Sequence, residues 1–357
     1  MSEQKIPFAD FQQKLKRIAP FVAQNRLEGP IQGLVVDPEQ GLLFASKFFG
    51  SCIHFLDSPV SEKTFVMPYS VFERLVKVSP NITWSGKIEQ LQTQMKVLLG
   101  SINIRFSPEE QKPYYIPDVI QENQADFSEE FIGSIDWIAD YMCQDDRKVS
   151  MYGLFVGDNI LYACDNIRLV SLKTEVPSVL KGTLLSFYCV SLIRKDKQLS
   201  HVIKSDQLIV FSSDSYVYTF SNVNASFPLV GGVFTRAESD SGTRIVLVQD
   251  DDEELQTFKN VLFSEMGSAP IEGHTENGFF VLRSLSREFL QTSVELKLRV
   301  ESMEGDIPTF TVNGKYFIEG LEKFKLMKVT PSYIYFYDAA GLANYIVMRM
   351  VGNAPTV

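Results

Sequence analysis

The sequence predicts an α+β protein built from three tandem copies of one domain, and three observations support this fold class. Two phrases recur in the same order about 120 residues apart. An amphipathic helix pattern precedes the first phrase in the first two copies. Apolar runs rich in Thr, Phe and Val, typical of antiparallel strands, follow in each copy. Together these patterns favour helices gathered on one face of mostly antiparallel sheets.

Length and composition limit the class of protein. The chain has 357 residues, of which 45% are hydrophobic and 12% aromatic, so it is long enough to form two or three domains. No stretch reaches the roughly 18 apolar residues of a membrane helix, and the first residues lack the apolar core of a signal peptide. We expect a soluble, cytoplasmic protein without a membrane partner. The four scattered cysteines, none in a C-x-x-C pair, are expected to be reduced core residues.

The first recurring phrase starts at a glycine and continues as two apolar runs around a turn. The phrase from Gly33 to Ser46 matches the phrase from Gly153 to Cys164, and the two glycines are 120 residues apart. A looser third match starts at Gly278, 125 residues after Gly153. We expect a strand hairpin from each phrase.

The second recurring phrase is a strand pattern that continues into a helix. Its copies start at Thr64, Thr183 and Thr309, at spacings of 119 and 126 residues. The helices that follow are expected at residues 69–78 in the first copy and 315–325 in the third. Because two independent phrases give one period, and that period is too long for a solenoid, the repeat unit is an ordinary domain.

The first helix of each copy and the closing hairpin complete the predicted domain. Apolar residues at steps of three and four predict helices around Leu15 and around Ile135. Residues 334–351 predict a hairpin with its turn at 338–341. The predicted domains are 1–120, 125–240 and 250–357, joined by linkers at 112–124 and 235–254. The acidic run 250–254 is interpreted as an exposed turn and the first turn of a helix, where acids favour the dipole, rather than as a metal site.

Signatures of catalysis are missing from the sequence. It has no phosphate-binding loop, dinucleotide fingerprint, G-x-S-x-G or H-E-x-x-H motif. His54, His201 and His274 are far apart, so we expect structural or surface roles for them. We therefore expect a non-catalytic protein with no cofactor and no metal, while an active site assembled from scattered carboxylates stays open as an alternative.

Cations are concentrated on the predicted helices although the net charge is −10. Five of the six predicted helices carry Lys or Arg, and the exception is the acidic helix at 128–142. One interpretation is that these are ordinary solvated faces. The other is a shared surface that meets phosphates without reading bases, which the repeat favours because equivalent helices can face a common axis. The candidate DNA-facing residues are Lys14, Lys16, Arg17, Arg26, Arg74, Lys77, Arg194, Lys195, Lys197, Lys259, Lys315 and Lys323.

The chain resembles the bacterial DNA polymerase III beta sliding clamp family. The resemblance lies in the three-copy layout, in A-C-D-N-I-R-L at residues 163–169, in F-x-V-N-x-x-Y at residues 310–316, and in a C-terminal strand with Met348 and Met350. The resemblance covers nearly the whole chain in the order and spacing of the motifs, and the three-copy layout is its strongest support.

The resemblance implies a non-catalytic DNA sliding clamp, or processivity factor. Such a clamp is a head-to-tail homodimer that closes a ring of six domains around duplex DNA, with helices lining the hole. It holds a DNA polymerase on its template, and it binds the polymerase and the clamp loader through their short linear motifs. Its DNA contacts are expected to be weak, water-bridged and blind to sequence.

The resemblance also assigns two protein interfaces. A first-domain edge strand with Ile102, Ile104 and Phe106 would meet a third-domain surface with Val261 and Leu262, and closure follows two-fold symmetry. A plain core role for the last two residues stays open. An apolar peptide pocket would lie between the second and third domains. Its residues would be Met151, Cys164, Asn166, Arg168, Leu169, Asn313, Tyr316, Ile346, Val347, Met348 and Met350.

The sequence departs from the family pattern at this pocket. Asn166-Ile167 replaces the usual Gly-His, and we expect a positive φ at Asn166 because Asn is the natural substitute for Gly there. Arg349 interrupts the usual Met-Pro-Met-Arg ending. The pocket is therefore expected to prefer a different motif, which suits a divergent or phage-encoded member. Asp165 and Arg168 are expected to brace the turn rather than to perform chemistry.

Two alternatives to a sliding clamp stay open at this point. One is a clamp-like scaffold that binds partner peptides without encircling DNA, which shares the fold but not the mechanism. The other is an uncharacterised enzyme on a repeated α+β scaffold.

Overall fold

The computed structural model describes residues 6–109, 124–248, 252–266, 270–284, 294–305 and 307–350. The predicted linker at 112–124 lies outside the described residues except for Gln124. The chain forms two compact units. Unit 1 comprises Met1–Glu129, Pro177–Leu180 and Asp196–Val223, and unit 2 comprises Glu130–Val176, Lys181–Lys195 and Asn224–Val357. The border between the units runs inside the second predicted domain, and the three domain boundaries stay predictions.

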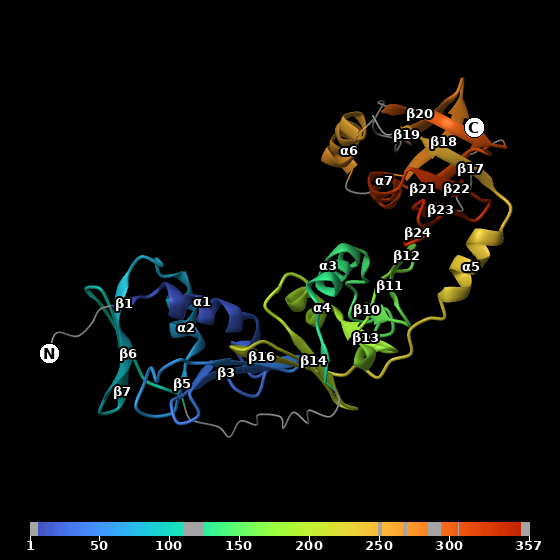
Figure 1. Ribbon diagram of the computed structural model, residues 1–357. Coiled ribbons are helices and arrows are strands. Elements are labelled where there is room, and N and C mark those ends of the chain that lie inside the picture. Colours follow the sequence, from blue (N-terminus) through green and yellow to red (C-terminus); the bar gives the residue numbers. More distant parts are fainter. Residues whose placement is uncertain are drawn as a thin grey trace. The chain divides into compact units, whose positions relative to one another are not determined.

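The order of secondary-structure elements recurs three times as strand, helix, four strands, helix and three strands (Figure 1). The first series is β1 (Ile6–Pro7), α1 (Ala9–Ile18), β2 (Leu34–Asp37), β3 (Leu42–Lys47), β4 (Gly50–Phe55), β5 (Phe65–Met67), α2 (Tyr69–Lys77), β6 (Thr83–Leu91), β7 (Gln94–Leu99) and β8 (Ile102–Phe106). The second series is β9 (Gln124–Asp126), α3 (Glu129–Ile138), β10 (Gly153–Val156), β11 (Ile160–Cys164), β12 (Arg168–Lys173), β13 (Thr183–Ser186), α4 (Phe187–Ile193), β14 (His201–Lys204), β15 (Leu208–Ser212) and β16 (Tyr216–Ser221). The third series is β17 (Thr243–Leu247), α6 (Asp252–Met266), β18 (Pro270–Glu276), β19 (Phe279–Ser284), β20 (Glu295–Glu304), β21 (Phe310–Asn313), α7 (Gly314–Lys323), β22 (Leu326–Val329), β23 (Tyr333–Tyr337) and β24 (Ala343–Met348). Short 3-10 helices η1 (Ala19–Phe21), η3 (Ala139–Tyr141) and η4 (Ser178–Leu180), and the helix α5 (Gly231–Ser239), complete the described elements.

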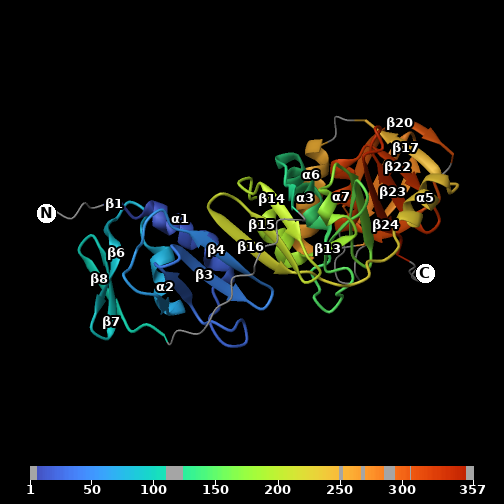
Figure 2. The same cartoon turned by 60° about the horizontal axis from the view of Figure 1, so that its bottom comes forward.

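Antiparallel sheets run from one series into the next, which confirms the predicted α+β class. Unit 1 holds an eight-stranded sheet in the order β5-β2-β3-β4-β16-β15-β14-β9 and a small sheet β1-β6-β7-β8 at its N-terminal end (Figure 2). Unit 2 holds one twelve-stranded sheet, β13-β10-β11-β12-β24-β23-β22-β17-β20-β19-β18-β21. The pair β4–β16 joins the first and second series, and the pair β12–β24 joins the second and third in the same register.

Amphipathic helices other than α5 cover one face of these sheets. The predicted first-copy helix is α1, and its apolar stripe of Phe11, Leu15 and Ile18 is buried, with Phe11 stacked 4.7 Å from the ring of Trp84. In Figure 1, α1 and α2 lie together above the strands β3 and β5 of unit 1. The helix predicted around Ile135 is α3, which also buries its apolar stripe. No helix in the described part of the chain is long and apolar enough to cross a membrane.

The closing hairpin and the cysteines also agree with the sequence predictions. β23 and β24 pair with their turn at Asp338–Gly341. Cys52, Cys143, Cys164 and Cys189 are all buried free thiols.

The third match to the first phrase was wrong by one strand. Gly33 and Gly153 start the first strand of each hairpin with φ of 129° and 145°, and a Cβ there would lie 2.2 Å from Met67 O or 2.0 Å from Leu185 O. Gly278 instead lies in the turn between β18 and β19, where Asn277 and Gly278 have φ of 50° and 82°. An Asn-Gly hairpin turn produces the same letters for a different reason, because both of its residues need positive φ.

The predicted linker at 235–254 was also wrong in its structure. It contains the end of α5, the whole of β17 and the start of α6. The linker was predicted because residues 235–254 are rich in Ser, Gly and Asp. The first of these residues instead continue α5, in which Phe234 and Ala237 are buried. The interpretation of the acidic run was correct where the run is described. Helix α6 begins at Asp252, and its next two residues, Glu253 and Glu254, are exposed.

Candidate functional sites

The predicted peptide pocket centres on the junction of β12 with β24 in unit 2. Directly paired residues of neighbouring strands lie on one face of a sheet. Cys164, Leu169 and Ile346 form such a row, and Met348 lies on the same face two residues beyond Ile346. The first three side chains are buried, whereas Met348 is 45% exposed. The structure therefore brings four of the predicted pocket residues onto one face.

Arg168 points to the opposite face of the same sheet, among the helices. Its guanidinium lies 4.5 Å from the centre of the Tyr316 ring and donates to Asp165, to Glu319 and to the carbonyl of Asp140. Burial opposes the charge, but Tyr345, Glu319 and Asp165 outweigh it and raise the pKa of Arg168 above its usual value. Burial raises the pKa of Glu319, and Arg168 opposes that shift. The ion pair of buried Arg168 with half-buried Glu319 joins the second series to the third.

The turn between β11 and β12 is braced by Asp165. Its carboxylate accepts hydrogen bonds from the backbone N–H of Ile167 at 2.8 Å and of Arg168 at 2.9 Å. This bears out the bracing role expected for Asp165 and Arg168. The positive φ expected at Asn166 was wrong, since the non-glycine residues with positive φ in the described part of the chain are Gln92, Asn159 and Asn277. The Asp165 side chain instead holds this turn through its two hydrogen bonds to the backbone.

The remaining pocket candidates surround the same junction from other elements. Asn313 caps the N-terminus of α7 by accepting from the N–H of Tyr316, and Tyr345 donates to the carbonyl of Tyr316 at 2.9 Å. Val347 pairs with Arg168 and is fully buried. Met350 is exposed and its N–H donates to Thr311. Met151 lies in the turn that precedes β10. Their roles in peptide binding stay predictions.

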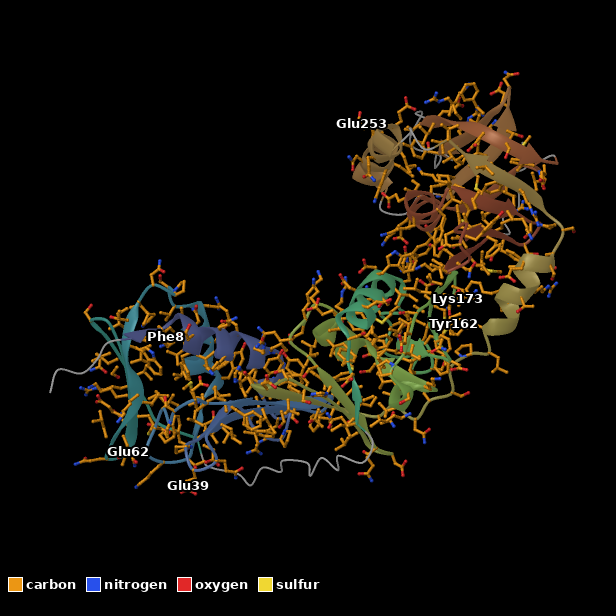
Figure 3. The ribbon with its side chains drawn as sticks, viewed as in Figure 1. Phe8, Glu39, Glu62, Tyr162, Lys173 and Glu253 are labelled. Carbon is orange, nitrogen blue, oxygen red and sulfur yellow. The ribbon has the colours of Figure 1, made fainter. Side chains whose placement is uncertain are left out.

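Helix α5 lies on the sheet face that carries Cys164, and no helix was expected there from the sequence. The Phe234 ring lies 6.1 Å from Tyr162 of β11, and Tyr162 shares its face with Cys164 two residues on. Figure 3 shows Tyr162 beside the yellow helix α5. The helix exposes Val233, and Leu229 just before it is exposed almost completely. The spacing of Phe227, Val230 and Phe234 was the available signal.

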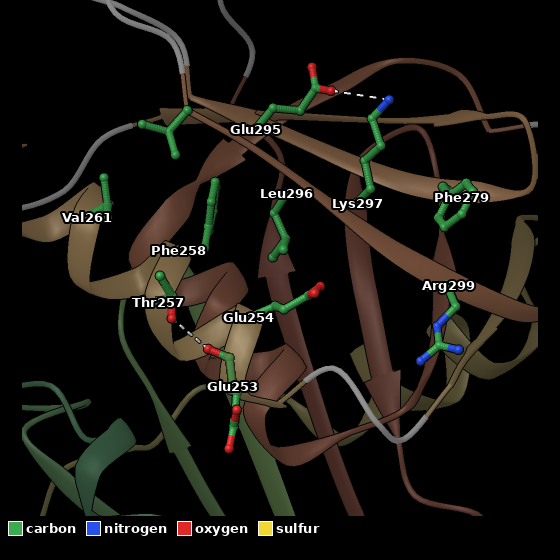
Figure 4. Close-up of a pocket in the computed structure, with 11 residues that line it drawn as sticks. Glu253, Glu254, Thr257, Phe258, Val261, Phe279, Glu295, Leu296, Lys297 and Arg299 are labelled. Atoms are coloured by element: carbon green, nitrogen blue, oxygen red, sulfur yellow. Dashed lines mark hydrogen bonds and ion pairs between the residues drawn. The ribbon is translucent and has the colours of Figure 1, made fainter.

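The predicted dimer residues lie on an edge strand and beside a cavity. β8 is the last strand of the four-stranded sheet, and it exposes Ile102, half-buries Ile104 and buries Phe106. Val261 is exposed on α6 next to a cavity of about 750 Å³ between α6 and the strands β19 and β20 (Figure 4). Leu262 is buried, as expected of a core residue. The lining of the cavity combines apolar side chains such as Phe258 with Glu254 and Lys297.

Five of the twelve candidate DNA-facing cations have carboxylate partners. The pairs are Lys14–Asp57, Arg17–Asp196, Lys77–Glu73, Arg194 with both Asp136 and Asp140, and Lys259–Glu322. Two more lie near aromatic rings, Lys315 over Tyr316 and Lys323 over Trp137. For the other five, the described residues place no carboxylate oxygen within 4.0 Å; these are Lys16, Arg26, Arg74, Lys195 and Lys197.

The three-fold series of elements, joined strand to strand, defines a DNA-clamp fold, and solved structures match it over almost the whole chain. A candidate DNA polymerase III beta subunit from Eubacterium rectale has a TM-score of 0.81 at 14% identity, covering 98% of this chain and 99% of that one. The DnaN sliding clamp of Bartonella birtlesii bound to griselimycin has a TM-score of 0.77 at 17% identity, covering 97% and 98%. The beta subunit of Thermotoga maritima has a TM-score of 0.76 at 17% identity with the same coverage.

No protein-family model and no curated protein matches this sequence. The chain has the fold of the DNA polymerase III beta sliding clamps, so the resemblance predicted from the sequence is confirmed at the level of the fold.

Proposed function

We propose that the protein is a non-catalytic DNA sliding clamp, which closes as a head-to-tail homodimer around duplex DNA and tethers a DNA polymerase and a clamp loader through a peptide groove. The observation that carries this proposal is the repeated strand junction. The third strand of the four-strand set in one series pairs with the last strand of the next series, as β4 with β16 and β12 with β24.

We infer that a third junction of the same kind forms between two copies of the chain. The remaining last strand is β8, which lies at the edge of its sheet. The remaining partner is β20, which pairs with β19 through Glu295–Arg299 and with β17 through its later residues. When β8 of one copy meets β20 of another, two-fold symmetry makes the second junction automatically and the ring closes.

The side chains of β8 support this pairing. The last strands of the three series, β8, β16 and β24, have equivalent positions at Ile102, Val217 and Asn344. Each of these residues forms the pair nearest the turn of its hairpin. Asn344 is 6% exposed inside its junction, whereas Ile102 is 52% exposed. Exposed apolar groups on an edge strand favour pairing with another chain. The cavity beside Val261 gives the opposing surface room for apolar side chains.

Weak electrostatics would hold the duplex inside this ring. Lys16 and Arg74 lie on helices of the first series, and Lys195 and Lys197 follow α4 in the second. Cations without carboxylate partners release counterions from phosphates and carry no base specificity. A ring that retains DNA topologically needs only such weak contacts, so it slides.

The peptide groove would bind the partners of the clamp. Its strand face carries buried Leu169 and Ile346 and exposed Met348, with Met350 just beyond. Methionine side chains repack easily around different apolar residues, which suits a surface shared by several partners.

A topological test decides the proposal. The protein is chemically cross-linked in the presence of a nicked circular plasmid, washed in high salt and then separated by size, with half of the sample linearised first. A clamp is expected to remain on the circle and to leave the linear DNA. Equal retention on both forms, or loss from both, would contradict encirclement. Loss from both with peptide binding retained would favour the alternative, a clamp-like scaffold that binds partner peptides without encircling DNA.

A further inference from the structure

The C-terminus of α5 is held by a buried lysine of a distant strand. Nζ of Lys328, in β22, donates to the carbonyls of Ala237 at 2.9 Å, Glu238 at 2.8 Å and Asp240 at 3.2 Å. The last carbonyls of a helix lack intrahelical partners, and they carry its negative dipole end. An ammonium group has three donors, so Lys328 satisfies three carbonyls at once.

The burial of Lys328 makes this contact costly to break. The residue is 4% exposed. Desolvation lowers the pKa of Lys328, and the nearby Arg244 lowers it further, whereas Asp240 and Glu238 raise it. A buried cation is stable only where it is paired and hydrogen-bonded. The carbonyls of α5 therefore stabilise Lys328, just as Lys328 stabilises the end of α5.

A second tie fixes the same end of the helix. The hydroxyl of Tyr333, in β23, donates to the carboxylate of Asp240 at 2.5 Å. Burial, together with Asp240, raises the pKa of Tyr333 to about 12, so the phenol stays protonated and remains a donor. Arg236 lies 3.5 Å from the same carboxylate. Two neighbouring strands of the third series thus hold one helix end.

The start of α5 is attached to the second series instead. Phe234 packs on Tyr162, and Phe227, just before the helix, stacks 5.0 Å from Phe155. The helix therefore connects β10 and β11 with β22 and β23 across one sheet face. Lys328 and Tyr335 are paired on that face, and Tyr335 is paired with Ile346. Leu169 and Cys164 continue the same row.

We propose that Lys328 is a positioning residue that holds α5 as one wall of the peptide groove. This inference rests on the proposed docking function. Leu229 is 98% exposed at the start of this wall, Val233 is exposed on it, and Met348 is exposed on the strand face where α5 ends near Tyr333. The occupant is an apolar linear segment of a partner protein, which places its side chains between α5 and Met348. If α5 is docked in only a fraction of the molecules, the apparent affinity for the partner segment falls to that fraction of its full value.

Hydrogen exchange and ligand binding test this inference on the full chain. In Lys328→Met the apolar stem remains but the three carbonyls lose their donor. The amides of Phe234–Ser239 are expected to exchange roughly tenfold faster or more, while the strands of unit 2 keep their protection. Griselimycin, which the Bartonella birtlesii clamp binds, serves as the probe, and its affinity is expected to fall roughly five- to tenfold. Tyr333→Phe is the milder second variant, used if Lys328→Met folds poorly.

A matched control and the contradicting outcomes complete the design. Lys181→Met removes an exposed lysine of unit 2 that is paired with Asp158, and it is expected to change neither readout. Unchanged exchange of α5 in both test variants would overturn the anchoring role. Faster exchange with unchanged griselimycin affinity would overturn α5 as a wall while leaving docking intact. Failure of the wild-type chain to bind griselimycin would overturn the inference, while the plasmid experiment tests encirclement of DNA independently.

Discussion

The guanidinium of Arg168 and the ring of Tyr316 lie 4.5 Å apart, in a buried cluster that joins the second and third series. Both residues were expected to line a peptide pocket. Each of the three guanidinium nitrogens of Arg168 donates a hydrogen bond, to Asp165, to Glu319 or to the carbonyl of Asp140. Val347, which is paired with Arg168 on the neighbouring strand, is fully buried. The contacts of Arg168 give it a structural task at the base of the candidate groove.

Replacement of Arg168 by Met is expected to destabilise unit 2 by about 3 kcal/mol, because it leaves the half-buried Glu319 without its cation. Glu319→Gln is expected to cost less, and the double variant less than Arg168→Met alone. Chemical denaturation of the four proteins in a double-mutant cycle measures this coupling. Lys181→Met, at an exposed ion pair, is the control and is expected to change stability by under about 1 kcal/mol. Additive effects would show that the two side chains are not coupled.

The two classes of glycine are expected to respond differently to alanine. Gly153→Ala would place a Cβ 2.0 Å from the carbonyl of Leu185 at a φ of 145°, so a neighbouring backbone must move. We expect a loss of about 3 kcal/mol or more. Gly278→Ala also has positive φ, but no atom lies within 4 Å of the new Cβ, so its cost is about 1 kcal/mol. Thermal unfolding of the two variants measures the difference, and equal costs would contradict the close approach.

Burial of His54 makes the stability of unit 1 dependent on pH. Desolvation lowers the pKa of His54 to about 4, while the nearby cations Lys14 and Arg17 act in the same direction. Between pH 6.5 and 4 the unfolded chain binds a proton that the folded chain does not, so stability falls as the pH falls through this window. The difference between the ordinary pKa of 6.5 and the folded-state pKa of about 4 corresponds to a loss of about 3 kcal/mol in the free energy of unfolding.

The variant His54→Phe removes this proton and is expected to flatten the pH profile between 6.5 and 4. Urea denaturation at several pH values measures the slope for wild type and variant. His201→Phe is the control, because His201 lies on a partly exposed strand of the same unit. A wild-type slope that persists in His54→Phe would assign the pH dependence to other groups.

Much of the fold was readable from the sequence because its elements have strong periodic patterns. The stripe with Leu15 and the stripe with Ile135 became α1 and α3, and the turn at Asp338–Gly341 closes the last hairpin as expected. The strand phrases that start near Thr64, Thr183 and Thr309 became β5, β13 and β21. In each case a single local pattern determines both the type and the position of the element.

The sequence predictions were wrong where the local composition is also typical of a different structure. Asn277-Gly278 is a hairpin turn, yet its letters match strand starts at which glycine is needed for close packing. The Ser, Gly and Asp content of residues 235–254 made the end of α5 resemble a linker. The carbonyls at that end are bound by Lys328, which is at least 88 residues away in the sequence. Which cations pair with acids, as Arg194 does with Asp136 and Asp140, depends on tertiary distances that no spacing rule contains.

The exposed apolar side chains of edge strand β8 lead us to expect a dimer that a single charged substitution disrupts. Ile102→Asp would bury a carboxylate at the proposed junction with β20, so the dissociation constant is expected to rise roughly a hundredfold or more. Leu27→Asp is the matched control, since Leu27 is also an exposed apolar residue of unit 1. Sedimentation equilibrium at micromolar concentration measures the mass of each protein. A wild-type monomer, or equal dimerisation of both variants, would contradict the ring.

The cations without carboxylate partners predict which charges affect DNA binding. Reversal of Lys16, Arg74 and Lys195 to Glu is expected to weaken the association with duplex DNA and to reduce its salt dependence. Each lost phosphate contact removes about 0.9 from the slope of log K against log salt, so three contacts per chain in a dimer would lower it by up to about 5. Fluorescence anisotropy over a range of salt concentrations measures the slope.

The control for this experiment reverses Lys63, Lys87 and Lys173, which lie on strands and loops and change the net charge by the same amount. If affinity depends on net charge alone, both triple variants will weaken equally, and a helix-lined DNA surface would be contradicted. If the helices face the duplex, only the first triple variant loses its salt slope, because phosphate contacts act over about one Debye length, near 10 Å at moderate salt. Circular dichroism of both variants confirms that the charge reversals leave the fold intact.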